Sequence, residues 1–127
     1  MAKDLLLISN TKVRGKILTH AFDEIKALLG QRQNVVFIPY ANPDGMGYAK
    51  YVGALQPTFS SLGYNLRLID DGVPQNDING AEAIFIGGGN TWQLLKDLKD
   101  RRLIYAIREI VNGGIPYIGS SAGSNVA

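Results

Sequence analysis

Near the end of the chain, two serines flanked by glycines are the residues best suited to carry chemistry. Residues Gly119 to Gly123 read Gly-Ser-Ser-Ala-Gly, which fits the pattern Gly-x-Ser-x-Gly centred on Ser121. An apolar run lies directly upstream and small residues follow, so the pattern indicates a sharp strand-to-helix turn that presents the Ser121 hydroxyl. The flanking glycines permit close backbone approach, and the N–H of Ala122 would face a developing oxyanion. The motif therefore predicts a serine nucleophile for acyl transfer.

The same five residues also fit a purely structural turn. Serine is a favoured helix N-cap, so Ser120 or Ser121 could simply cap the helix that follows. A five-residue glycine-serine pattern is a weak signal in a chain that contains 15 glycines. Spacing and context alone leave both interpretations open.

A second glycine cluster follows another apolar run. It consists of Gly87, Gly88, Gly89 and Asn90. Successive glycines free backbone N–H donors, but the spacing matches neither the dinucleotide-binding fingerprint nor the P-loop. We interpret the cluster as an oxyanion-hole segment that partners the serine turn. The alternative is a flexible loop in which Asn90 or Thr91 caps the next helix.

Strands and helices alternate along the chain in a way that would position both clusters. Continuous apolar runs predict strands covered on both faces, and apolar residues at helical spacing predict the segments between them. Parallel strands place functional residues at their carboxyl ends. The pattern predicts one α/β domain over residues 1–127, with an open, doubly wound and mostly parallel sheet. The predicted strands are 5–8, 35–38, 66–69, 83–86 and 115–118, with Gly119 beginning a tight turn; the helices are 15–29, 48–62 (kinked or broken at Pro57), 91–98 and 103–111.

Composition excludes several classes of protein. The 127 residues suit a single globular domain, and the net charge of +2 disfavours nucleic acid or an anionic membrane as a partner. No apolar run approaches the roughly 18 residues of a membrane span. The absence of cysteine removes thiolate chemistry and fits a reducing, cytoplasmic compartment. We found no cofactor or metal motif and expect neither.

The residues around the two clusters resemble peptidase E, the aspartyl dipeptidase family of serine peptidases. The resemblance is carried by residues 85–95 (Phe-Ile-Gly-Gly-Gly-Asn-Thr-Trp-Gln-Leu-Leu) and 117–125 (Tyr-Ile-Gly-Ser-Ser-Ala-Gly-Ser-Asn). Residues 5–10 and 36–41 are also similar to that family's N-terminal half. The resemblance implies a flavodoxin-like fold of the class I glutamine amidotransferase type. It also implies a small peptide substrate, a dipeptide with N-terminal aspartate.

The resemblance implies a role for each matching residue. Ser121 is the nucleophile, and the backbone N–H groups of Gly89 and Ala122 form the oxyanion hole. Asn90 lies beside that hole, and Ser120 stands where the family commonly has tryptophan. The supporting loop residues are Gly87, Gly88, Asn90, Gly119 and Gly123.

The base that would activate the serine is not evident in this chain. By resemblance, the catalytic histidine, its acidic partner and the basic residue that binds aspartate lie downstream of the nucleophile, whereas the sequence ends six residues after Ser121. Its one histidine, His20, is interpreted as a packing or capping residue, and Asp70 and Asp71 as turn formers. We therefore expect the N-terminal part of a truncated peptidase E-like domain that is nearly inactive by itself.

Two other functions are alternatives to a serine peptidase. A non-catalytic binding or interaction module would keep the fold without the chemistry, and the missing base favours it. A glutaminase is disfavoured because its nucleophile is cysteine and the chain has none. Truncation within the fold is expected to expose apolar surface, which would favour a homodimer.

Overall fold

The structure, a computed structural model, describes residues 5–8, 12–13, 16–17, 22–40, 48–69, 81–87, 90–120 and 123. Strands and helices alternate along these residues, as the apolar runs predict. In chain order the elements are β1 (Leu5–Ile8), β2 (Lys12–Val13), β3 (Lys16–Ile17), α1 (Phe22–Leu29), β4 (Asn34–Ile38), α2 (Tyr48–Ser61), β5 (Asn65–Leu68), β6 (Ala83–Ile86), α4 (Thr91–Asp100), α5 (Ile104–Asn112) and β7 (Tyr117–Ser120).

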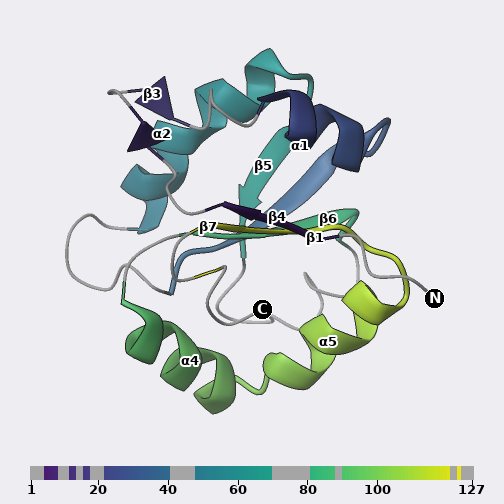
Figure 1. Ribbon diagram of the computed structural model, residues 1–127. Coiled ribbons are helices and arrows are strands. Elements are labelled where there is room, and N and C mark those ends of the chain that lie inside the picture. The colour runs from purple at the N-terminus through teal and green to yellow at the C-terminus, as the bar shows by residue number, and fades with distance from the viewer. Residues whose placement is uncertain are drawn as a thin grey trace.

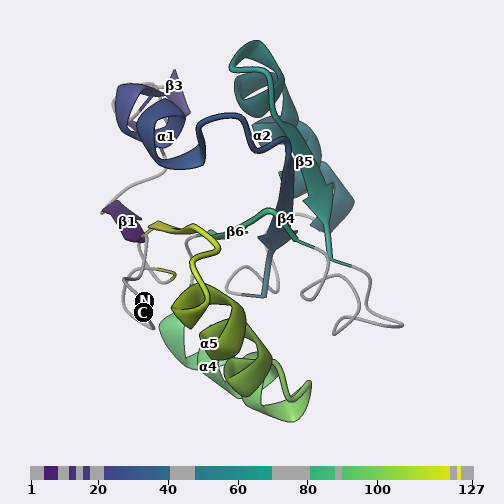
Figure 2. The same ribbon diagram turned by 90° about the vertical axis from the view of Figure 1, so that its right-hand side faces the viewer.

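Five of these strands form one parallel sheet in the order β1-β7-β6-β4-β5. Helices α1 and α2 cover one face of the sheet, and α4 and α5 cover the other (Figures 1 and 2). Strands β2 and β3 pair separately as a small antiparallel ribbon. This arrangement confirms the predicted open, doubly wound α/β fold. It also brings the carboxyl ends of β6 and β7 together, because these two strands are neighbours.

A separate hydrophobic core lies on each face of the sheet. The core beneath α1 and α2 is built around Phe85. The centre of its ring lies 5.3 Å from the ring centre of Phe37 and 5.4 Å from that of Phe59. The core beneath α4 and α5 includes Ile86, Leu94, Leu98, Ile107 and Tyr117. Strand β6 sends alternate side chains into the two cores, which explains why its sequence is apolar without interruption.

The predicted helices differ from the observed ones in two places. Residues Lys16 and Ile17 lie in β3, so α1 begins only at Phe22; pairing with β2 prevails over the helical spacing of the apolar residues. Helix α2 continues through Pro57, so the predicted break is wrong, whereas the predicted kink stays a prediction. Pro57 and Gly53, whose carbonyl group would bond to residue 57, are both exposed, so water can replace the missing donor. No helix within the described ranges is long and apolar enough to cross a membrane.

Strand β1 lies at the edge of the sheet and carries exposed apolar side chains. Leu5 is 43% exposed and Leu7 is 50% exposed, although both belong to a continuous apolar run. Among the described strands, β1 is paired only with β7. Such an edge favours association with further polypeptide. The predicted homodimer is untested by these observations and stays a prediction.

Candidate active site

The described residues of the two glycine clusters lie around the ends of β6 and β7. Gly119 pairs with Ile86 of β6 on one side and with Leu7 of β1 on the other, and Ser120 pairs with Ile8. Strand β7 therefore runs through Ser120, and the prediction that Gly119 begins the turn is wrong. Pairing on both sides overcomes the low strand preference of glycine at this position. Ser120, the last residue of this strand, is fully buried.

Gly123 lies directly against the last residue of β6. It is helical and buried, and a Cβ atom placed on it would overlap the carbonyl oxygen of Ile86. That atom would also lie 2.8 Å from the carbonyl carbon and 3.1 Å from the Cβ atom of Ile86. Only glycine fits such close backbone contact without displacement. Gly123, the second glycine of the serine motif, is thus required because it packs against Ile86, the residue that precedes Gly87.

A buried hydrogen bond also holds Gly123. The Tyr117 hydroxyl donates to the Gly123 carbonyl oxygen at 2.5 Å. Six residues of extended strand span about 20 Å, far more than one tyrosine side chain can bridge. Gly123 therefore lies much closer to Tyr117 than a continued strand would place it. Burial raises the pKa of the Tyr117 hydroxyl well above its ordinary value, so this group remains a protonated donor at neutral pH.

Asn90 caps the helix that follows the other glycine cluster. Its backbone is extended, with φ −85° and ψ 114°, and its side-chain oxygen accepts a hydrogen bond of 3.0 Å from the N–H of Gln93. The interpretation of Asn90 as an N-cap is confirmed. The positive end of α4 therefore lies at Asn90, where it provides a favourable environment for negative charge.

We expect Asn90→Ala to destabilise the protein by about 1 kcal/mol, because it removes the acceptor for an N–H group in the first turn of α4. Urea denaturation provides the measurement. Asn90→Asp keeps a capping oxygen and is the matched control, with an expected loss below about 0.5 kcal/mol. Equal losses in the two variants would contradict the capping role.

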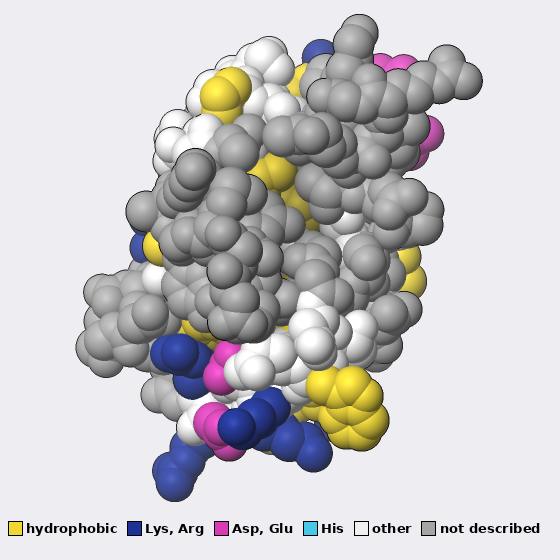
Figure 3. Space-filling view, turned by 90° about the vertical axis from the view of Figure 1, so that its left-hand side faces the viewer, with side chains coloured by type: hydrophobic (Ala, Val, Ile, Leu, Met, Phe, Trp, Pro, Cys, Tyr) yellow, Lys and Arg dark blue, Asp and Glu magenta, His cyan; other side chains and the backbone are white. Residues whose placement is uncertain are grey.

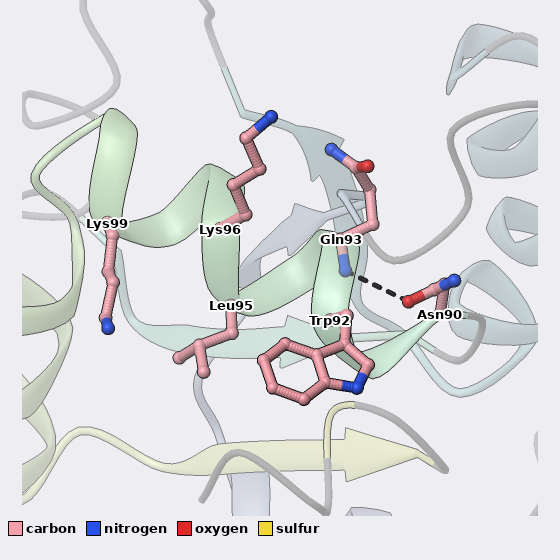
Figure 4. A pocket seen from close by; sticks show the side chains of 6 residues that line it. All are labelled: Asn90, Trp92, Gln93, Leu95, Lys96 and Lys99. Carbon is pink, nitrogen blue, oxygen red and sulfur yellow. Dashed lines mark hydrogen bonds between the residues drawn. The ribbon is translucent and has the colours of Figure 1, made fainter.

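A pocket of about 420 Å³ lies alongside α4, next to the glycine cluster. Figure 4 shows its lining; the Trp92 indole, 82% exposed, and the Leu95 side chain lie on one side of the helix. The face of the molecule that includes α4 carries Lys and Arg side chains interspersed with Asp and Glu (Figure 3). The pocket is lined by Asn90, Trp92, Gln93, Leu95, Lys96 and Lys99. Within the described part of the chain, no three His, Asp or Glu side chains gather as metal ligands.

The structure brings together part of the predicted site. Gly87, Asn90, Gly119 and Gly123 lie around the ends of β6 and β7. The remaining predicted residues lie outside the described residues, so their roles stay predictions. These are Ser121, Ala122, Gly88 and Gly89, together with His20, Asp70 and Asp71.

Sequence reasoning did not single out Tyr117. The available signal was a tyrosine within a strand predicted to be covered on both faces, because the hydroxyl of a buried tyrosine usually requires a hydrogen-bond partner. The sequence does not identify that partner, because Gly123 lies six residues further along the chain, beyond the end of β7.

Comparison with known proteins gives a consistent result. Residues 5–127 match the model of Peptidase family S51. A peptidase E from Nostoc sp. is 40% identical, with the alignment covering all of this chain and 53% of the relative. A Drosophila melanogaster protein named "Probable alpha-aspartyl dipeptidase" is 37% identical over 99% of this chain and 53% of its own length. The chain thus spans about half the length of the curated relatives that it matches.

Solved structures show the same fold. A Listeria monocytogenes protein described as a candidate peptidase E superposes with a TM-score of 0.76 at 28% identity, covering 95% of this chain and 59% of that one. A peptidase from an acI-B1 actinobacterium gives a TM-score of 0.75 at 21% identity, over 94% of this chain and 54% of its own. At that identity the second likeness shows the fold alone.

Proposed function

Because this chain belongs to peptidase family S51, we propose that it supplies the nucleophile and the oxyanion hole of a serine dipeptidase. The proposed substrate is a dipeptide with N-terminal aspartate, in line with the relatives named peptidase E and alpha-aspartyl dipeptidase. The proposed nucleophile is Ser121, and the proposed oxyanion donors are the N–H groups of Gly89 and Ala122.

In the proposed reaction, the Ser121 hydroxyl oxygen attacks the carbonyl carbon of the scissile peptide bond while a general base takes its proton. The two backbone N–H groups stabilise the negative charge on the tetrahedral intermediate. The base then protonates the leaving amine, and water hydrolyses the acyl-enzyme. By resemblance, the base and its acidic partner come from sequence that follows this segment in the longer relatives.

One observation supports this proposal most directly: Gly123 packs on Ile86. This contact joins the segment two residues after Ser121 to the residue immediately before Gly87. A serine turn and an oxyanion-hole segment must be adjacent to act on one carbonyl group, and a capping turn alone would not require that contact. The Tyr117 hydrogen bond to Gly123 supports the same sharp bend.

The test compares an aspartyl dipeptide with the dipeptide of reversed sequence, using the protein as its own cells produce it. We expect release of free aspartate from the first substrate and covalent labelling of Ser121 by a fluorophosphonate, located by mass spectrometry. The 127-residue segment assayed by itself should retain at most the roughly 10³–10⁴-fold catalysis over water that triad deletions leave. A protein that neither turns over the dipeptide nor reacts at Ser121 would be a non-catalytic module instead.

A further inference from the structure

We propose that Tyr117 is a positioning residue that holds the serine turn in its reactive geometry through the hydrogen bond to the Gly123 carbonyl group. This inference rests on the proposed function. Tyr117 is the first residue of β7, whereas Ser121 follows the last. The Tyr117 side chain has no part in the reaction steps given above.

The hydrogen bond joins two residues that flank the proposed nucleophile in the sequence. Tyr117 is the first residue of β7, and Gly123 lies beyond the strand's end. In the sequence, the proposed nucleophile, Ser121, comes directly after the last residue of β7 and two residues before Gly123. Fixing both ends of so short a segment removes much of its conformational freedom.

Both anchored points are themselves immobilised by their surroundings. Tyr117 is 4% exposed, lies in the core under α4 and α5, and pairs with Leu5 on one side and Ile84 on the other. Gly123 is pressed against Ile86, so it cannot move toward β6. The hydrogen bond restrains movement of the Gly123 carbonyl group away from Tyr117. Contact and hydrogen bond together fix the peptide of Gly123 relative to the end of β6.

Such a restraint should affect the rate of the chemical step more than substrate binding. An error of about 1 Å in the position of a reacting group can lower the rate by about 10²-fold. Burial keeps the Tyr117 hydroxyl protonated, so the donor persists throughout the neutral range. We accordingly expect a change in kcat at nearly constant KM when the hydroxyl is removed.

The chain offers a matched control for this test. Tyr64 is also buried, and its hydroxyl donates to the carbonyl oxygen of Gly30 at 3.2 Å, in the core on the opposite face of the sheet. Tyr117→Phe and Tyr64→Phe each remove one bond from a phenol to a glycine carbonyl. Only the first of these bonds lies beside the serine turn.

The experiment measures kcat and KM for the aspartyl dipeptide, the rate of fluorophosphonate labelling and the thermal midpoint, in the protein as its cells produce it. We expect Tyr117→Phe to lower both kcat and the labelling rate by about tenfold or more, with KM within about twofold. Tyr64→Phe should change the thermal midpoint but leave both rates within about twofold. p-Aminophenylalanine at position 117 retains a donor and should restore most of the rate.

Wild-type rates in Tyr117→Phe, or equal rate losses in the two Phe variants, would overturn the positioning role while leaving the proposed function intact. A wild-type protein that neither hydrolyses the dipeptide nor reacts with fluorophosphonate would overturn both. If Tyr117→Phe does not fold, p-methylphenylalanine at that position fills the space of the hydroxyl without a donor, and the same comparison applies.

Discussion

Ser121→Ala is expected to lower kcat for the aspartyl dipeptide by about 10⁴–10⁶-fold, the range seen when the nucleophile of a serine hydrolase is removed. The variant has no oxygen to attack the carbonyl carbon, so the acyl-enzyme cannot form. KM should change little, because the substrate's other contacts remain. Steady-state kinetics give both constants, and fluorophosphonate labelling should disappear at the same time.

Ser61→Ala is the matched control for this experiment. Ser61 is an exposed serine at the end of α2, whose hydroxyl donates to the Thr58 carbonyl oxygen at 2.7 Å. Its replacement should leave kcat, KM and labelling unchanged. If Ser121→Ala retained more than about a tenth of wild-type kcat, hydrolysis would have to proceed through another group, and the proposed nucleophile would be wrong.

Gly123→Ala is expected to damage both stability and activity, because the added methyl group would occupy the space of the Ile86 carbonyl group. Forcing atoms into a packed site of this kind costs about 1–3 kcal/mol. Separating Gly123 from Ile86 would also move the serine turn relative to the glycine cluster. We therefore expect a fall in kcat of about 10²-fold or more, measured together with the free energy of unfolding in urea.

Gly53→Ala provides a control in which the effect on stability should have the opposite sign. Gly53 lies exposed within α2, and a Cβ atom on it would have no neighbour within 4 Å. Alanine is favoured over glycine inside a helix by about 0.5–1 kcal/mol, so this variant should be more stable than wild type, with unchanged kcat. Wild-type stability and activity in Gly123→Ala would show that residue 123 does not pack on Ile86.

Features that depend on neighbouring residues were predicted well. Asn90, one of the two residues offered as a cap for the next helix, caps α4 through its own side chain. The uninterrupted apolar runs of β4 and β6 predicted strands buried on both faces. Each of these features follows from the local chemistry of a few consecutive residues.

Features that depend on distant partners were predicted poorly. Gly119 continues β7 only because Leu7 and Ile86 pair with it from either side. Likewise, β3 forms where helical spacing predicted the start of α1, because its residues pair with β2. Local preferences amount to tenths of a kcal/mol per residue, so pairing and burial readily override them.

The sequence by itself determined the class of fold, the positions of the buried strands and the two glycine clusters that mark the candidate site. Only the tertiary structure decided that Gly123 lies against Ile86 and accepts a hydrogen bond from Tyr117. Apolar runs that form strands, and residues that cap helices, are encoded by amino acids adjacent in the chain. A contact between strand ends depends on sheet order and on the space between packed atoms, which one segment cannot specify alone.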